Sequence, residues 1–299
     1  MSESYHIPVL LKESIAALDV KAGGVYADLT FGGGGHSKAI LDMLGQYGRL
    51  LAFDRDKDAA KNIPDDKRLL FAHSNFRYIN NFAKYYGIDS FDGILADLGV
   101  SSHHFDESER GFSFRFDGPL DMRMNQDSDI TAEYIVNNYS ESQLADIFYY
   151  YGELFQSKRI AAEIVKVRSK KNISTIFEFV DIVERFCGKD KKKDLAKIFQ
   201  ALRIEVNDEL DSLKAMLLET TKALKPKGRL VIITYHSLED RLVKNFMKTG
   251  NFEGNVEKDF YGKVLSPFSP IGKVITPSDT EVADNPRSRS AKLRVAERN

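Results

Sequence analysis

The chain has little of several residue types that mark specialised classes of protein. It has a single cysteine, Cys187, which cannot form an internal disulfide bond and so favours a reducing compartment. Its 8 prolines and 20 glycines exclude collagen-like and low-complexity classes. No apolar run approaches the roughly 20 residues of a membrane span, and the first residues lack the pattern of a signal peptide. We therefore expect a cytoplasmic globular protein without membrane contact.

An excess of one charge is also missing from the chain as a whole. It carries 43 Lys and Arg against 44 Asp and Glu, so any surface for nucleic acid must be local. Residues 156–203 carry 13 basic against 6 acidic side chains, and residues 284–299 carry 5 against 2. Hydrophobic residues make up 42% of the sequence, which is enough to bury a sizeable core.

The first hundred residues alternate short apolar runs with amphipathic segments. Strands are predicted at Val25–Thr30, Arg49–Asp54, Leu69–Ala72 and Phe91–Leu98. Helices are predicted at His36–Leu44, around Lys57–Asn62 and at Phe76–Tyr86. Repeated strand–helix–strand units with short links predict a parallel sheet in an α/β fold.

This alternation stops after Val100 and returns near the C-terminus. Residues 101–128 have the composition of a loop, and Ile130 to about Leu224 is helical throughout. A strand at Lys227–Tyr235, a helix from Leu238 to Lys248 and a strand-like Lys292–Val295 follow. We predict one α/β domain, residues 1–106 and 209–299 with a basic tail, interrupted by an all-helical insertion at 107–208 that recognises the substrate.

The segment after the first predicted strand has the layout of a cofactor site. Asp28 ends the strand, Gly32 to Gly35 form a loop, and a helix begins near His36. Glycines let a ligand approach the backbone, and Asp54 ends the next strand where an acidic side chain can bind ribose hydroxyls. The alternative is a mobile tight turn, with Asp54 as a helix cap.

Three cofactors compete for this layout. Gly35-His36-Ser37 lacks the lysine of a phosphate-binding P-loop, and the spacing Gly32, Gly34, Ser37 matches a dinucleotide fingerprint incompletely. S-adenosylmethionine, which has a ribose and no phosphate, suits Asp28, the glycines and Asp54 better. The layout favours a methyltransferase and leaves open a Rossmann-type NAD-dependent oxidoreductase.

Longer motifs follow one another along nearly the whole chain. They are His6-Ile7-Pro8-Val9-Leu10, Gly33-Gly34-Gly35-His36-Ser37, Asp97-Leu98-Gly99-Val100-Ser101-Ser102, Arg110-Gly111-Phe112-Ser113-Phe114, Gly118-Pro119-Leu120-Asp121-Met122-Arg123-Met124, Phe199-Gln200-Ala201-Leu202-Arg203-Ile204, His236-Ser237-Leu238-Glu239-Asp240 and Asn285-Pro286-Arg287-Ser288-Arg289-Ser290. In this order they resemble the RsmH (MraW) family of ribosomal RNA small-subunit methyltransferases.

The resemblance implies a class I (Rossmann-like) methyltransferase fold with a helical insertion. It also implies S-adenosylmethionine-dependent methylation of the N4 amine of one cytidine in the decoding (P-site) region of 16S rRNA, in the free rRNA or the small subunit. The family's cofactor-binding positions fall on Gly34, Gly35, His36, Asp54, Phe76 and Asp97. His104 stands where the family usually has glutamine. That departure leaves open a non-catalytic ribosome-assembly protein.

The chemistry of N4 methylation assigns roles to a few residues. Asp97, at the end of the fourth predicted strand, is the candidate catalytic acceptor for an N–H of the amine; the alternative is a carboxylate that binds only the cofactor. Leu98-Gly99-Val100 holds no aromatic residue to stack on a flipped base, so Phe112 or Phe114 is the candidate. Methylation of carbon-5 would need a cysteine nucleophile. The single cysteine, Cys187, lies in the helical insertion, away from the strand ends, so no covalent mechanism is implied.

Other residues are candidates for contact with the RNA. Arg287 and Arg289, together with Lys292 and Arg294, are suited to phosphate contact, unless the tail is a solvated charged terminus. His236, after a buried strand, either faces the pocket or has a structural role. No Cys/His set has the spacing of a metal site, and the sequence leaves a monomer or a homodimer open.

Overall fold

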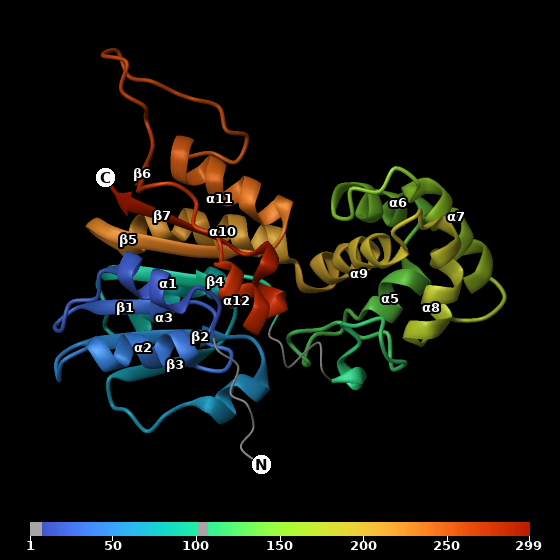
Figure 1. Cartoon of the computed structure of the whole chain (residues 1–299), viewed down its shortest axis with the longest axis horizontal. Helices are drawn as coiled ribbons and strands as arrows, with labels where there is room; N and C mark the ends of the chain where they lie inside the picture. The colour runs from blue at the N-terminus through green and yellow to red at the C-terminus, as the bar shows by residue number, and fades with distance from the viewer. Residues whose placement is uncertain (1–7, 101–106) are drawn as a thin grey trace. The chain divides into compact units, whose positions relative to one another are not determined.

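The computed structural model describes residues 8–100 and 107–299. The chain divides into two compact units: an α/β unit, Met1–Gly99 with Leu210–Asn299, and a helical unit, Val100–Glu209. In Figure 1 the α/β unit comprises the blue, cyan and orange-to-red elements, and the helical unit is mainly green and yellow. Each unit has a hydrophobic interior of its own.

A seven-stranded sheet forms the centre of the α/β unit. Its strands are β1 (Val25–Asp28), β2 (Arg49–Asp54), β3 (Leu69–His73), β4 (Phe91–Asp97), β5 (Leu224–Thr234), β6 (Phe268–Pro270) and β7 (Lys292–Arg298). Their order is β3-β2-β1-β4-β5-β7-β6. Neighbours from β3 to β5 pair in parallel, whereas β7 is antiparallel to both β5 and β6. The order reverses beside β1, which is the switch point where ligands bind in doubly wound sheets.

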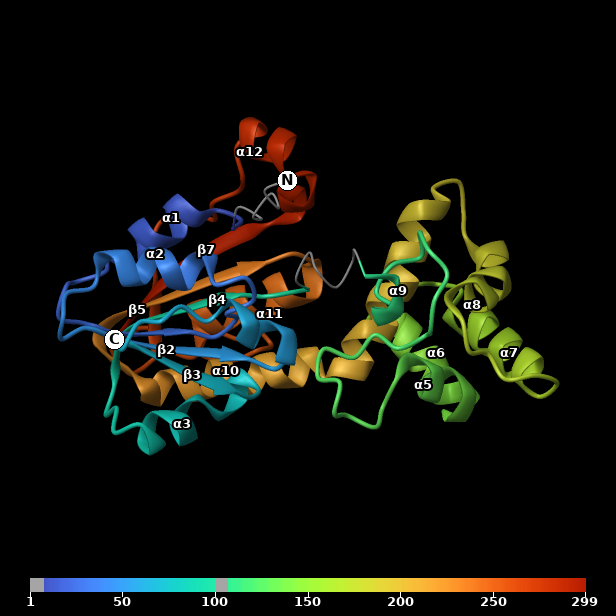
Figure 2. The ribbon, with the colours of Figure 1, turned by 90° about the horizontal axis from the view of Figure 1, so that it is seen from below.

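Helices cover both faces of this sheet. The α-helices of the unit are α1 (Leu11–Leu18), α2 (Gly35–Met43), α3 (Ile79–Tyr85), α10 (Glu209–Ala223), α11 (Ser237–Thr249) and α12 (Asp279–Asp284), and its 3-10 turns are η1 (Lys57–Asn62), η2 (Phe76–Tyr78) and η5 (Pro286–Ser290). Figure 2 shows α1 and α2 on one face, with α3 and α10 on the other.

The strands are apolar along their length because both faces are buried. Successive side chains of a strand point to opposite faces. Tyr26 thus packs in the cluster that contains α1 and α2, and Ala27 packs in the cluster that contains α3, α10 and α11. The next parallel strands repeat this alternation, which explains the near-continuous hydrophobic runs in the sequence.

The helical unit is built from five α-helices and two 3-10 turns among its described residues, and four of these α-helices have side-chain N-caps. They are η3 (Ser108–Arg110), α5 (Ala132–Asn138), α6 (Glu141–Tyr150), α7 (Ser157–Arg168), α8 (Ile176–Val183), η4 (Glu184–Phe186) and α9 (Lys191–Asn207). Ser140 with Gln143 and Thr175 with Glu178 form capping boxes at the starts of α6 and α8. These reciprocal bonds satisfy the first backbone N–H groups and fix where each helix begins.

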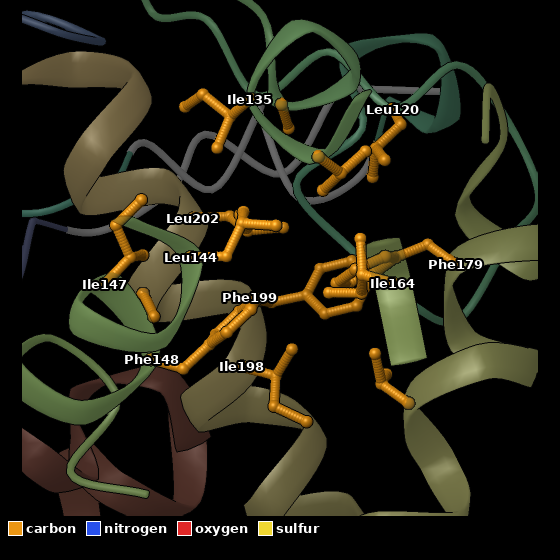
Figure 3. Close-up of a cluster of buried hydrophobic side chains, with 14 of the residues drawn as sticks. Leu120, Ile135, Leu144, Ile147, Phe148, Ile164, Phe179, Ile198, Phe199 and Leu202 are labelled. Carbon is orange, nitrogen blue, oxygen red and sulfur yellow. The ribbon is translucent and has the colours of Figure 1, made fainter. Parts of the chain in front are cut away.

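Large apolar side chains fill the centre of this unit, as Figure 3 shows. Phe199 of α9 contacts Phe179 of α8 at 5.9 Å and Phe114 of the preceding loop at 5.4 Å between ring centroids. Asn207 is buried, and its side chain accepts the N–H of Met124 and donates to the carbonyl of Met122. The loop before α5 is therefore tied to the last turn of α9.

The predicted fold class is confirmed, with local differences. The segment Lys57–Asn62 is a 3-10 turn rather than an α-helix, and β5 begins at Leu224 rather than Lys227. The short strand β6 and the helix α12 had no clear signal in the sequence. Within the described residues, no helix is long and apolar enough to cross a membrane.

Candidate cofactor and active site

The loop between β1 and α2 is shaped by glycines and held by Asp54. Gly32 and Gly34 have φ angles of 51° and 77°, and a Cβ added at Gly32 would meet nothing within 4 Å. The N–H of Gly32 donates to Oδ2 of Asp54 at 2.7 Å, and the N–H of Asp56 donates to Oδ1 at 2.8 Å. The backbone of the loop is thus left open to a ligand, while Asp54 fixes its geometry.

Asp28 lies in the protein interior beneath this loop, not on its solvent-facing side. Its side chain is fully buried, and Oδ2 accepts the hydroxyl of Ser37 at 2.6 Å while Oδ1 accepts the N–H of Thr30 at 3.1 Å. Burial raises the pKa of Asp28, although these hydrogen bonds oppose the rise. A carboxyl group with no exposed surface is an internal anchor, so Asp28 supports the loop through Ser37 and Thr30.

Asp97 ends β4 next to this anchor. Its backbone N–H donates to Oγ1 of Thr30 at 2.7 Å, and Oδ1 accepts the hydroxyl of Tyr235 at 2.7 Å. Burial raises the pKa of Asp97 to about 6, against the opposing effects of His36 and Tyr235. The side chain still keeps 22% of its exposure. It is therefore a partly desolvated carboxylate that an incoming group can reach.

His36, in the first turn of α2, faces the same carboxylate. Its Nδ1 lies 3.9 Å from Oδ2 of Asp97. Burial lowers the pKa of His36, despite the nearby charge of Asp97 and a hydrogen bond to the backbone of Val9. Its Nε2 is buried and has no hydrogen-bond partner among the described residues. Since buried polar atoms are nearly always bonded, this nitrogen is suited to a polar group of a ligand.

Phe76 lies at the start of η2, which follows β3. Asn75 caps this turn by accepting the N–H of Arg77 at 3.0 Å, and the guanidinium of Arg55 lies 5.7 Å from the centre of the Phe76 ring. Phe76 is half-buried. The sheet thus brings Gly34, Gly35, His36, Asp54, Phe76 and Asp97 to segments at or just beyond the carboxyl ends of neighbouring parallel strands.

The two candidate stacking rings differ in burial. Phe112 is only 4% exposed and belongs to the core of the helical unit, so neither of its faces is open to a base. Phe114 is half-buried and packs edge-to-face against Phe199. Phe112 is therefore corrected to a core residue, and Phe114 remains the candidate.

The basic tail separates into two pairs of residues. Lys292 and Arg294 both bind Asp240, at 3.2 Å and 2.7 Å. Burial opposes ionisation of Asp240, but the hydrogen bonds from Arg294 and Lys292 outweigh it and lower the pKa. The expectation that these two cations contact phosphate is corrected, because they hold β7 to α11. Arg287 and Arg289 lie in η5 with exposed side chains.

His236 serves as the N-cap of α11. Its Nδ1 accepts the N–H of Glu239 at 3.5 Å, and its Nε2 lies 3.2 Å from Oε1 of Glu239. These contacts support a structural role for His236 rather than a position facing the pocket. His104 lies outside the described residues.

Three residues of the site carried no assigned role in the sequence: Thr30, Ser37 and Tyr235. Thr30 connects the two carboxylates, because its hydroxyl oxygen accepts from Asp97 and its backbone donates to Asp28. All three lie within ten residues of the carboxyl end of a strand in the sheet. That position was the available signal, since ligands bind at this edge of the sheet.

Comparison with known proteins places the chain in a family. A model of the MraW methylase family matches residues 3–299. Relatives named ribosomal RNA small subunit methyltransferase H include one from Bacteroides fragilis, 60% identical over 99% of this chain and 98% of its own length. Others are from Parabacteroides distasonis, 61% identical over 98% and 97%, and Flavobacterium johnsoniae, 52% identical over 98% of each.

Among solved structures, an rRNA methylase from Streptococcus thermophilus is 9% identical with a TM-score of 0.43, covering 96% of this chain and 92% of that one. The match to the family model along the chain excludes the NAD-dependent oxidoreductase. The chain therefore belongs to the MraW methylase family, and it is a methyltransferase whose methyl donor is S-adenosylmethionine.

Proposed function

We propose that this protein methylates the N4 amine of a cytidine in the decoding (P-site) region of 16S ribosomal RNA. The relatives named above are small-subunit rRNA methyltransferases, which supports rRNA as the substrate. The choice of the cytosine amine rests on one observation, the environment of Asp97. This carboxylate is partly desolvated and reachable, and its pKa is about 6.

An exocyclic amine needs such a group because its lone pair is delocalised into the ring. S-adenosylmethionine supplies an electrophilic methyl group on a sulfonium. When the Asp97 carboxylate accepts a hydrogen bond from one N–H, electron density stays on the nitrogen as it attacks. In-line transfer would form the N4–CH3 bond as the S–CH3 bond of the bound cofactor breaks, and Asp97 would take the proton that the amine loses. With a pKa of about 6, Asp97 is ionised at neutral pH and ready to accept it.

The residues around Asp97 are assigned to the cofactor. Gly34 and Gly35 are assigned by their positions in the family motif, although a Cβ added at Gly34 would meet Phe31 at 3.0 Å and one added at Gly35 would meet Pro8. Asp54 offers a carboxylate for the ribose hydroxyls, and His36 an unbonded nitrogen. Phe76 and His104 complete the set by their positions in the family motifs. Asp54 accepts the N–H groups of Gly32 and Asp56, which holds its carboxylate beside the glycine loop. The unbonded nitrogen of His36 and the carboxylate of Asp54 are groups whose chemistry suits the polar parts of S-adenosylmethionine.

We assign recognition of the RNA to the helical insertion, 107–208, and to Arg287 and Arg289. The helical unit as a whole carries 16 basic and 20 acidic side chains, so only its segment 156–203 can form a basic face. Within it, Lys192 and Lys193 are exposed and form no ion pair with described residues, whereas Lys191 is paired with Glu184. Phe114 is the candidate to stack on the flipped base.

Nucleoside analysis tests the proposal most directly. Small subunits from a strain that lacks the protein should lack one N4-methylcytidine in 16S rRNA, and the purified enzyme with labelled S-adenosylmethionine should restore it. A methyl group on carbon-5 would contradict the role given to Asp97. Binding to the subunit without methyl transfer would instead support the non-catalytic assembly protein.

A further inference from the structure

Tyr235 joins the end of β5 to the turn that follows β4. Its hydroxyl donates to Oδ1 of Asp97 at 2.7 Å. Its ring covers Gly99, where an added Cβ would lie 3.1 Å from Cδ2 of the tyrosine. Gly99 has a φ angle of 108°, a conformation that other residues rarely adopt. One side chain therefore contacts both ends of the turn Asp97-Leu98-Gly99.

The tyrosine is itself held in place from two sides. Its N–H donates to Oε2 of Glu239 at 3.1 Å, and Glu239 is 3% exposed in the first turn of α11. On the strand side, the N–H of Leu98 donates to the carbonyl of Ile233 at 2.9 Å, which continues the pairing of β4 with β5. A donor whose position is fixed before the substrate arrives needs no reorganisation during the reaction.

The hydroxyl of Tyr235 remains a donor at all working pH values. Burial, with the adjacent Asp97 next, raises the pKa of Tyr235 well above its usual value. The titratable groups that face Asp97 are His36 from α2, Tyr235 after β5, Asp28 from β1 and Glu239 from α11. Of these, His36 and Tyr235 favour the charged form of Asp97, whereas Asp28 and Glu239 oppose it.

We propose that Tyr235 is a positioning residue for Asp97: by occupying Oδ1, it presents Oδ2 to the amine of the substrate. The inference rests on the proposed function, in which Asp97 accepts the N–H. It assigns the two carboxylate oxygens to different tasks, since Oδ1 bonds to the tyrosine and Oδ2 faces His36 at 3.9 Å. The same hydrogen bond helps to keep the carboxylate ionised.

The test is Tyr235→Phe, which removes the hydroxyl and keeps the ring over Gly99. We expect kcat for methyl transfer to fall by about tenfold or more at pH 7, because a hydrogen bond to a charged group is lost. The Kd for S-adenosylmethionine should stay within about twofold. The acid limb of the kcat profile should move to higher pH, so that the deficit is larger at pH 6 than at pH 8. A deficit of equal size at every pH would overturn the proposal.

A matched control is Tyr26→Phe, in β1. This tyrosine is also buried, but its hydroxyl bonds to the backbone of Lys21 and Asp19, far from the carboxyl ends of the strands. It should leave the pH profile of kcat unchanged. A shift of the acid limb in Tyr26→Phe would show that the readout reports general loosening of the sheet and would overturn the assignment to Tyr235.

A double-mutant cycle separates this inference from the proposed function. If Tyr235 acts through Asp97, the variant with both Asp97→Asn and Tyr235→Phe should be no slower than Asp97→Asn alone. Additive losses with N4-methylcytidine still the product would overturn the role of Tyr235 only. Full activity of Asp97→Asn, or a carbon-5 product, would instead overturn the proposed function.

Discussion

The two units of the molecule differ in what they bury. In the helical unit, the interior consists mainly of aliphatic and aromatic side chains, and its buried polar side chains among the described residues include Arg110, Ser157 and Asn207. In the α/β unit, the carboxylates of Asp28, Asp56 and Glu239 are buried, and Asp97 lies near Asp28 and Glu239. Burying a carboxylate opposes folding unless hydrogen bonds satisfy it.

This difference shows where the fold has been adapted for chemistry. Asp28, Asp97 and Glu239 each accept hydrogen bonds from neighbouring hydroxyl or N–H groups, which reduces the energetic cost of burying them. Perturbed carboxyl groups of this kind gather at functional sites. The interior of the helical unit contributes stability, and under the proposed function this unit binds RNA through its surface.

The largest effect is expected at the carboxylate that performs the chemistry. Asp97→Asn keeps the shape of the side chain but removes its charge, so kcat should fall by about 10²–10⁴-fold. Cofactor affinity, measured by calorimetry, should fall by less. Asp89→Asn is the matched control, since Asp89 is exposed just before the amino end of β4. Equal losses in kcat and affinity would make Asp97 a cofactor ligand only.

A large effect on stability, without an effect on the cofactor, is expected in the other unit. Phe199→Ala leaves a cavity between α8 and the loop of Phe114, and should lower the free energy of unfolding of the helical unit by about 3–5 kcal/mol in urea titrations. Phe177→Ala on α8 is the control, because that ring is 46% exposed. Loss of S-adenosylmethionine binding in Phe199→Ala would contradict the separation of tasks.

An intermediate effect is expected at Asp54. Asp54→Ala removes the proposed ribose acceptor and the bond that holds Gly32, so cofactor binding should weaken by about 1.5–3 kcal/mol in isothermal calorimetry. The maximal rate at saturating cofactor should change less, since the contact is made in both the ground and the transition state. Asp65→Ala, at an exposed position of the same unit, serves as control. Unchanged affinity in Asp54→Ala would remove it from the site.

The smallest effect is expected on the surface of the helical unit. Changing Lys191, Lys192 and Lys193 to Glu should weaken RNA binding and flatten its salt dependence by about 0.7–0.9 per lost phosphate contact. Binding of S-adenosylmethionine should be unaffected. The same change at Lys12, Lys67 and Lys84, which are exposed on the α/β unit, alters the net charge equally. A salt slope that responds alike in both variants would make the effect one of net charge.

The sequence by itself determined the alternation of strands and helices, the α/β class and the glycine loop. These features depend on local patterns, namely hydrophobic periodicity and residues with special backbone freedom. It also placed Asp54 and Asp97 at strand ends and His36 at the start of the helix after the glycine loop, and parallel strands bring these segments to one edge of the sheet. The family resemblance was identified from long motifs, each of which is a continuous stretch of the sequence.

Only the tertiary structure decided which of these side chains face one another. Asp28 and Asp97 look alike in sequence, each the last residue of an apolar strand, yet one is fully buried and the other is reachable. Tyr235 is 138 residues from Asp97 and bonds to it because β4 and β5 are neighbours. Lys292 and Arg294 appeared to be cations for RNA until Asp240 was found beside them. The hydrogen-bond partners and the burial of a side chain depend on residues that are distant in the chain. These contacts determine whether each group is charged and whether a ligand can reach it.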